Sequence, residues 1–239
     1  MEYQSVFKRY ELKFLLTKKQ QQTLTDSMAK YMQPDHYGRT VIRNIYFDTE
    51  DYRLIRHSIE KPAYKEKLRI RSYQQTEPDS TVFVELKKKY KSIVYKRRLA
   101  MTESEAADWI FLDNQPPQRS QISCEIDYFR KYYKALHPAI FLSYERLAYC
   151  CKDGSDFRVT FDDHILCRQN DISLQSEIYG TPLLPDNMVL MEIKCPGGIP
   201  IWMTNILSRE RIYKTSFSKY GTAYQTIIFP KLKEAVYYA

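Results

Sequence analysis

The chain has 239 residues and a formal net charge of +8, from 37 Lys and Arg against 29 Asp and Glu side chains. An apolar content of 44% excludes a disordered polycation and is typical of a globular protein with a sizeable core. No apolar run approaches the ~18 residues of a membrane-spanning helix, and no signal peptide is visible, so we expect a cytoplasmic protein.

The first half of the chain alternates apolar and charged residues, which predicts β-strands with one face of each kind. Strands are expected over 5–16, 40–48, 63–73, 81–90 and 92–101. Helices are expected over 17–32 and over 102–112, where Thr102 and Glu105 form a capping box. In the third of these strands four cations share one face: Lys65, Lys67, Arg69 and Arg71.

Three further strands are expected in the second half, over 139–150, 156–163 and 188–194. Asp153 and Gly154 predict a hairpin turn between the first two of them. Helices are expected over 122–136 and 216–229. The polar faces of these three strands carry the following residues: Tyr144, Arg146, Arg158, Thr160, Asp162, Glu192 and Lys194.

Positive charge is concentrated between Lys61 and Arg98, where twelve Lys and Arg side chains stand against four acidic ones. A solvated sheet face is one interpretation of this pattern. However, eight strands in an open sheet would leave exposed edges, so we expect closure into a barrel with the charged faces inside. Like charges around a narrow space are costly unless an anion fills it, which predicts a polyanionic ligand. By parity or loop position, four cations are expected at the outer surface instead: Lys88, Lys89, Lys91 and Arg97.

Other classes of ligand have no matching motif. The six glycines form neither GxGxxG nor GxxxxGK, the two common nucleotide-binding patterns. The five cysteines lack CxxC spacing, and the four histidines lack the spacing of metal ligands. Because an RNP-type aromatic motif and a helix-turn-helix pattern are also missing, we expect no nucleic-acid partner.

Seven short motifs follow one another along nearly the whole chain. They are Arg-Tyr-Glu-Leu-Lys at 9–13, Leu-Arg-Ile-Arg at 68–71, Val-Glu-Leu-Lys at 84–87, Tyr-Glu-Arg at 144–146, Phe-Arg-Val-Thr-Phe-Asp at 157–162, Glu-Ile-Lys at 192–194 and Phe-Ser-Lys-Tyr at 217–220. With this ordered set the chain resembles the VTC domain, the polyphosphate polymerase domain of the triphosphate tunnel metalloenzymes. It resembles more distantly the CYTH-type adenylyl cyclases and thiamine triphosphatases. The resemblance implies a single α+β domain over residues 1–239, an antiparallel eight-stranded β-barrel tunnel flanked by helices.

The resemblance also implies an ATP:polyphosphate phosphotransferase, which moves the γ-phosphoryl group of ATP onto a growing inorganic polyphosphate chain. Mn²⁺ or Mg²⁺ is the implied cofactor, and Glu192 is the implied metal ligand. Phosphoryl transfer requires positioning and charge neutralisation rather than a protein nucleophile, which agrees with a cationic tunnel. The implied catalytic phosphate cradle is Lys13, Arg69, Arg71, Lys87, Arg146, Arg158 and Lys219. Further substrate contacts are expected from Lys96, Tyr144, Lys194 and Ser218.

One position departs from the pattern of the wider superfamily, which begins with Glu-x-Glu-x-Lys, because Arg9 stands where the first glutamate would be. The loss of one metal carboxylate favours the polymerase branch over the hydrolases and cyclases. Two alternatives remain, a hydrolase of tripolyphosphate or nucleoside triphosphates and a non-catalytic module that binds polyphosphate. Export of a polymer would require a membrane-protein partner.

Overall fold

The computed structural model describes residues 6–91 and 93–237, so Ser5 and Ser92, the first residues of two expected strands, lie outside it. Within this part of the chain the strands are β1 (Val6–Thr17), β2 (Met32–Asp48), β3 (Tyr64–Ser72), β4 (Thr81–Tyr90), β5 (Ile93–Thr102), β6 (His137–Cys151), β7 (Arg158–Arg168), β8 (Thr181–Pro182), β9 (Met188–Cys195) and β10 (Lys214–Thr215). The helices are α1 (Lys18–Met28), α2 (Arg53–Ile59), α3 (Glu103–Ile110), α4 (Gln121–Tyr133), α5 (Ile201–Arg209), α6 (Lys219–Ala223) and α7 (Phe229–Tyr237), with a π-helical turn η1 (Tyr224–Ile228).

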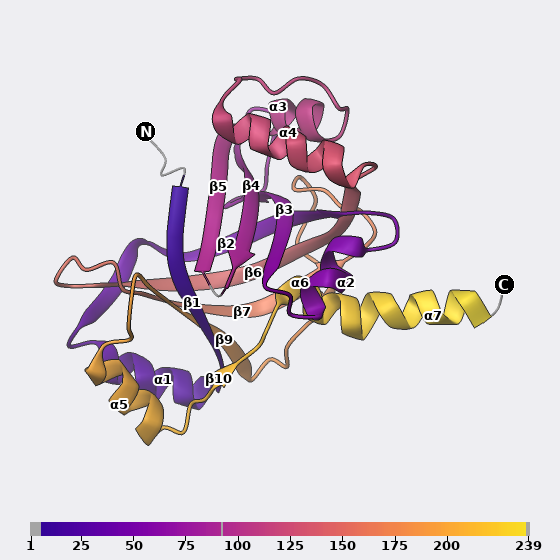
Figure 1. The fold of residues 1–239 in the computed structure, drawn as a ribbon. Coiled ribbons are helices and arrows are strands. Elements are labelled where there is room, and N and C mark those ends of the chain that lie inside the picture. Colours follow the sequence, from indigo (N-terminus) through magenta and orange to yellow (C-terminus); the bar gives the residue numbers. More distant parts are fainter. Residues whose placement is uncertain (1–5, 92, 238–239) are drawn as a thin grey trace.

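Eight strands form a closed antiparallel ring in the order β1-β5-β4-β3-β2-β6-β7-β9. The ring closes through β9, which pairs with both β7 and β1. Long strands β2, β6 and β7 cross the direction of β3, β4 and β5, so the ring is not an even barrel (Figure 1). The α+β class and the antiparallel eight-stranded ring are therefore confirmed.

Alternation along each strand separates an apolar outer face from a polar inner face. On β3, Leu68 and Ile70 are buried against the outer helices, whereas Arg69 and Arg71 alternate with them and face inward. Helices α3 and α4 cover this outer face with Trp109 among other apolar side chains. Helices α1 and α5 cover the outer faces of β1, β7 and β9 in the same way. Two apolar clusters therefore cover the outside of the ring. A third, which includes Ile42, Leu190 and Tyr220, fills part of its interior next to the polar side chains.

Two strands are longer than the sequence predicts. β2 begins at Met32 rather than Thr40, and β7 continues to Arg168 rather than Asp163. The pairing register of β2 shifts between Pro34 and Arg39, so polar residues interrupt the alternation on which the prediction depended. The short helices α2 and α5 were not predicted. By contrast, the capping box of α3 is present as predicted.

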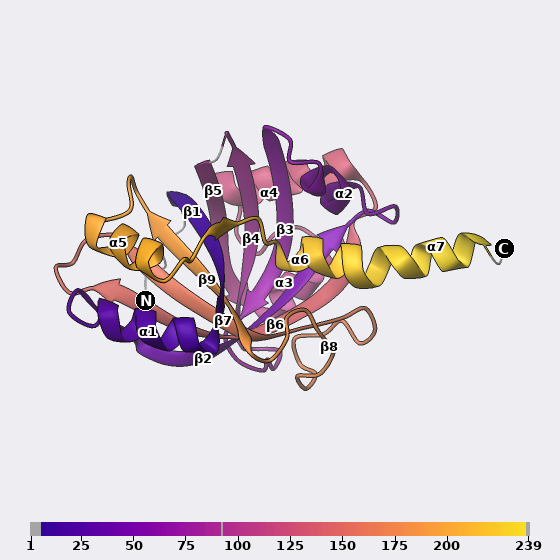
Figure 2. The ribbon, with the colours of Figure 1, turned by 90° about the horizontal axis from the view of Figure 1, so that it is seen from below.

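The C-terminal region crosses one opening of the ring. Figure 2, seen from below, shows the segment between α5 and α6 passing in front of β3 and β4 before α7 extends away from the body. The helix predicted over 216–229 begins at Lys219 and continues through η1 and α7 to Tyr237. Among the described residues no helix is both long and apolar enough to cross a membrane.

Candidate functional site

The ring interior contains two groups of charged side chains, one around Glu192 and one around Glu85. Ten of the twelve residues expected at the site belong to one of these groups or lie next to one. They are Lys13, Arg69, Arg71, Lys87, Lys96, Tyr144, Arg146, Glu192, Lys194 and Lys219. The other two, Arg158 and Ser218, lie nearer the openings of the ring.

Glu192 of β9 is surrounded by four cations, which come from β1, β6, β9 and α6. Its carboxylate oxygens lie 3.4 Å from the ammonium groups of Lys13 and Lys194 and 3.6 Å from the guanidinium of Arg146. Lys219 of α6 is 3.9 Å away. Burial alone would raise the pKa of Glu192, but these cations outweigh it and hold the pKa well below its ordinary value. Glu192 is therefore ionised at neutral pH.

Asp162 of β7 fixes two of those same cations. Its carboxylate accepts hydrogen bonds from Arg146 at 2.6 and 2.7 Å and from the Lys219 ammonium group at 2.5 Å. The Glu192 carboxylate, in contrast, accepts no hydrogen bond from the described residues. Directly opposite Glu192 on β7, the buried hydroxyl of Thr160 also has no partner among them. The polar groups around Glu192 are thus incompletely satisfied, which distinguishes this carboxylate from Asp162.

Glu85 of β4 is the centre of the second group. Its carboxylate accepts hydrogen bonds from Arg69 at 2.8 Å and from Arg98 at 2.7 Å, and it lies 3.4 Å from the Lys96 ammonium group. Burial lowers the pKa of Lys96 to about 6. The charge of Glu85 raises this pKa, but the charges of the neighbouring arginines lower it again. The site therefore contains a lysine that titrates near neutral pH.

Arg71 connects the two groups. It donates hydrogen bonds to Asn44 of β2 and to the hydroxyl of Tyr144 on β6, each at 2.9 Å. The ring of Tyr144 lies 4.2 Å from the Lys219 ammonium group. A rigid polar network consequently runs from β3 across the interior to α6.

The start of α6 is anchored across one opening by two lysines of the ring. Lys13 donates to the carbonyl of Phe217 at 2.7 Å, and Lys67 donates to the hydroxyl of Ser218 at 3.1 Å. Ser218 also caps α6 by accepting from the amide of Gly221. These contacts bring Lys219 into the interior, and its side chain is only 8% exposed.

Arg158 lies at the rim of the ring. Its guanidinium pairs with Asp35 of β2 at 3.0 Å, and its side chain is 38% exposed. The sequence prediction missed several interior residues: Glu11, Lys67, Glu85, Arg98 and Asp162. Each lies two residues from a predicted site residue, or four in the case of Asp162, so strand parity was the signal that could have identified them.

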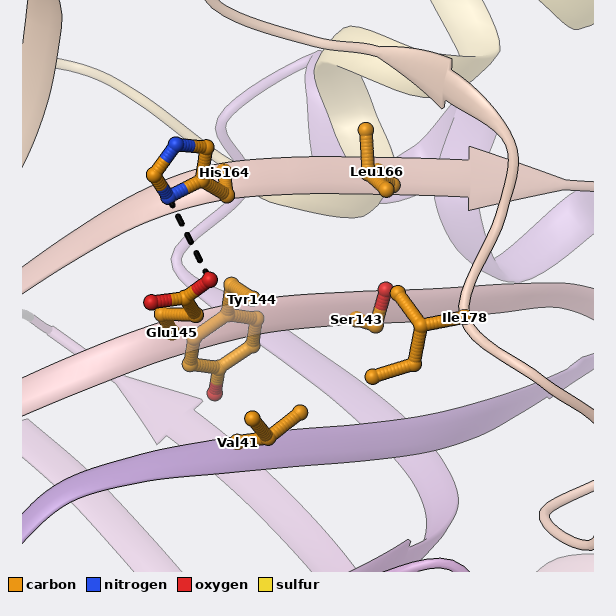
Figure 3. A pocket seen from close by; sticks show the side chains of 7 residues that line it. All are labelled: Val41, Ser143, Tyr144, Glu145, His164, Leu166 and Ile178. Atoms are coloured by element: carbon orange, nitrogen blue, oxygen red, sulfur yellow. Dashed lines mark ion pairs between the residues drawn. The ribbon is translucent and has the colours of Figure 1, made fainter.

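An acidic cluster is also present outside the ring. Glu145, Asp163 and His164 bring their donor atoms within 4.8 Å of one another, and His164 lies 3.5 Å from Glu145 (Figure 3). The adjoining cavity has a volume of about 210 Å³. Arg39 donates hydrogen bonds to both carboxylates, at 2.5 and 2.7 Å, so part of their charge is compensated within the protein. This cluster is separate from the interior carboxylates.

The interior contains more cations than carboxylates, and burial lowers the pKa of Lys13, Lys96 and Lys194 below the ordinary lysine value. Burial, and then the charges of Lys13, Lys65 and Lys87, hold the pKa of Lys67 well below the ordinary lysine value. Such an arrangement favours an anion with several charged oxygens, because each added oxygen can accept from a cation that lacks full compensation.

Comparisons with known proteins agree with this geometry. The model of the VTC domain family matches residues 8–228. No curated protein sequence matches the chain. A putative adenylate cyclase from Bacillus halodurans is similar in structure, with a TM-score of 0.57 and 16% identity over 90% of this chain and 96% of that chain. A putative adenylyl cyclase from Hippeastrum, described as having a dominant triphosphatase activity, gives 0.56 and 15% over 91% and 95%. Both share the fold of this chain.

Proposed function

Because the chain belongs to the VTC domain family, we propose that it is a metal-dependent polyphosphate polymerase that transfers the γ-phosphoryl group of ATP to a growing chain. The observation that carries this proposal is the match of the family model to residues 8–228, a range that contains the whole cationic ring except the first two residues of β1. Polyphosphate and ATP both present the row of charged oxygens that the interior suits. The chain is accordingly a triphosphate tunnel protein, and the polymerase activity is the specific proposal.

In this proposal the triphosphate of ATP lies between the two charged groups, with the adenine outside the ring. Arg69 and Arg71 present guanidinium groups to successive phosphates from alternate positions of one strand. In the substrate-free protein Glu85 binds Arg69 and Asp162 binds Arg146. The two guanidinium groups are therefore held in position before the substrate arrives. Phosphate oxygens would then share these cations with the two carboxylates.

Glu192 fits the metal ligand that the family implies. Its carboxylate is a hard oxygen donor without a hydrogen bond from the described residues, and the unpartnered Thr160 hydroxyl lies opposite. Four cations within 3.9 Å would repel a free divalent ion, so we expect Mn²⁺ or Mg²⁺ to bind together with phosphates. When bound, the ion would neutralise charge on the non-bridging oxygens.

No protein nucleophile is needed for the transfer. The terminal oxygen of phosphate, pyrophosphate or the polymer would attack the γ-phosphorus in line while the bond to ADP breaks. Lys219 would stabilise the developing charge as a protonated ammonium group. Burial tends to lower the pKa of Lys219, but Asp162 and Glu192 outweigh it and raise the pKa above the ordinary value.

The test is incubation of the purified protein with ATP and Mn²⁺, followed by a gel stained for polyphosphate. We expect a ladder that is lost in Glu192→Ala and in the double variant Arg69→Ala/Arg71→Ala. Lys131→Met, which removes a charge from the exposed face of α4, is the matched control and should keep the ladder. ATP turnover that survives in the double arginine variant would contradict the assignment.

A hydrolase of tripolyphosphate or nucleoside triphosphates is the second candidate. It is favoured by the triphosphatase activity described for the Hippeastrum protein of the same fold. Release of free phosphate without a ladder would identify this activity. Tight binding of polyphosphate without any turnover would instead identify a non-catalytic binding module.

A further inference from the structure

Side chains of β3, β4 and β5 form transverse rows inside the ring, and the rows differ in charge balance. One row contains Arg69, Glu85 and Arg98, which are directly opposite one another on the three strands. Glu85 lies between the two arginines and forms ion pairs with both of them. This row therefore includes an acid among its cations, and it makes up much of the Glu85 group.

The next two rows, toward the hairpin that joins β4 and β5, contain lysines and no acid. Lys67 lies opposite Lys87, and Lys87 lies opposite Lys96. One step further, Lys65 lies opposite Lys89. Like charges directly opposite each other on adjacent strands destabilise a sheet, so these rows are costly in the protein alone. Lys89 shares the inward parity of Lys87, and its expected position on the outer surface was wrong.

Three of these lysines have no carboxylate within ion-pair distance in the described part of the chain: Lys65, Lys67 and Lys89. Lys65 donates to the carbonyl of Ser58 at 2.9 Å, and Lys67 donates to the hydroxyl of Ser218. These acceptors are neutral and leave the ammonium charge uncompensated. Both β3 lysines are only half-buried, so a ligand in the opening can reach them.

The row of cations along β3 is longer than a triphosphate. From Arg71 to Lys65 the chain advances six residues, roughly 20 Å at the rise of a β-strand. Three phosphorus atoms joined by two bridging oxygens cover only part of that path, so a triphosphate at Arg69 and Arg71 leaves the lysine rows unoccupied. A longer phosphate chain would continue past Lys67 to Lys65 and Lys89.

We propose that Lys65, Lys67 and Lys89 form an extension of the phosphate path, which binds the part of a polyphosphate chain beyond the first three phosphates and leads it out beside the β4–β5 hairpin. This inference rests on the proposed function and assigns a direction to it. The polymer lies on the lysine side, and the Arg69–Glu85–Arg98 row, which includes an acid, lies on the other.

The test compares two probes, tripolyphosphate and long-chain inorganic polyphosphate, by titration calorimetry. Lys65→Met/Lys67→Met keeps most of the aliphatic length of both side chains and removes two charges. We expect its affinity for the long polymer to fall by roughly tenfold or more, since a hydrogen bond to a charged group contributes about 1.5–3 kcal/mol. Its affinity for tripolyphosphate should stay within about twofold.

Lys18→Met/Lys19→Met is the matched control, because it removes two charges from the exposed start of α1 and should change neither affinity. The salt dependence gives a second measurement. Two lost phosphate contacts should lower the slope of log affinity against log salt by about 1.4 for the long polymer in the β3 variant. A defect in folding alone would affect both probes equally.

The outcomes separate this inference from the proposed function. If the natural protein binds neither probe, the proposed function fails and this extension fails with it. If it binds tripolyphosphate and the β3 variant loses affinity for both probes equally, or for neither, only the extension is wrong. Tighter binding of random-sequence RNA than of long polyphosphate would also overturn it, in favour of a nucleic-acid surface.

Discussion

Lys96 shows how burial of a single charged residue in this interior lowers the free energy of unfolding. Its ammonium group is buried near Arg69, Arg71 and Arg98, and burial lowers its pKa to about 6 although Glu85 lies 3.4 Å away. In the unfolded chain the same lysine has its ordinary pKa of 10.5. Between these two values the unfolded chain binds more protons than the native protein, so the free energy of unfolding rises with pH in that window.

We therefore expect Lys96→Met to be more stable than the natural protein at pH 6.5. Removal of the lysine relieves its desolvation and leaves Glu85 paired with two arginines, and each kcal/mol relieved should raise the melting temperature by about 2–4 °C. The gain should shrink as the pH rises from 6.5 toward 9. Urea denaturation at both pH values measures it, with Lys131→Met as the control. A variant that is less stable than the natural protein at pH 6.5 would contradict this account.

The resemblance to the VTC domain implied the individual site residues, and strand parity explains why most of them have their side chains inside the ring. Arg69 and Arg71 lie inside because Leu68 and Ile70 must lie outside, and that alternation is visible in the chain. The pairing of charges could not be predicted, because it depends on register. Nothing local indicates that Glu85 lies opposite Arg69, or that Lys67 lies opposite Lys87.

At the level of elements, the start of α6 is where a segment outside the ring contacts the lysines of the interior. Ser218 caps this helix and accepts from Lys67, while Lys13 holds the preceding carbonyl of Phe217. The sequence predicted a helix here, although it begins at Lys219 rather than at residue 216. Helices α2 and α5 were missed for a related reason, since seven and nine residues are too few for a clear helical period.

Ser218→Ala should separate the capping role of this hydroxyl from its role in the site. Loss of the cap should cost about 1 kcal/mol, a fall in melting temperature of about 2–4 °C. Ser120→Ala removes the corresponding cap of α4, away from the interior, and should cost a similar amount. Only Ser218→Ala should also weaken the binding of long polyphosphate, because Lys67 loses its hydrogen-bond acceptor. Equal polyphosphate affinity in the two variants would show that Ser218 acts on the helix alone.

At the scale of the whole molecule, the surplus of interior cations lowers the stability of the protein without its ligand. An anion that binds only the native state relieves this repulsion and adds its binding free energy. At a tripolyphosphate concentration of 100 times the dissociation constant, the stabilisation should be about 2.7 kcal/mol, or roughly 5–10 °C in melting temperature.

This shift should decrease as sodium chloride is raised from 50 to about 500 mM, because salt screens the long-range part of the attraction. Thermal denaturation with sulfate at matched ionic strength is the control, and it should give a much smaller shift. A shift that is equal for sulfate and tripolyphosphate would indicate a general salt effect. A shift that does not change with salt would contradict an electrostatic origin.

The closure of the ring through β9 also determines when the protein can fold during synthesis. The C-terminal half of β1 pairs with β9, so residues 10–17 have no partner on that side until residues 188–195 have left the ribosome. Until then β1 and β7 keep open edges, and the lysine-rich faces of β3 and β4 stay in contact with water. Pairing between such distant segments is slow, so the barrel should form as a unit late in translation rather than strand by strand. A nascent chain arrested before β9 would present both edges and an unclosed cationic face to the polyanions around it, including the ribosome itself.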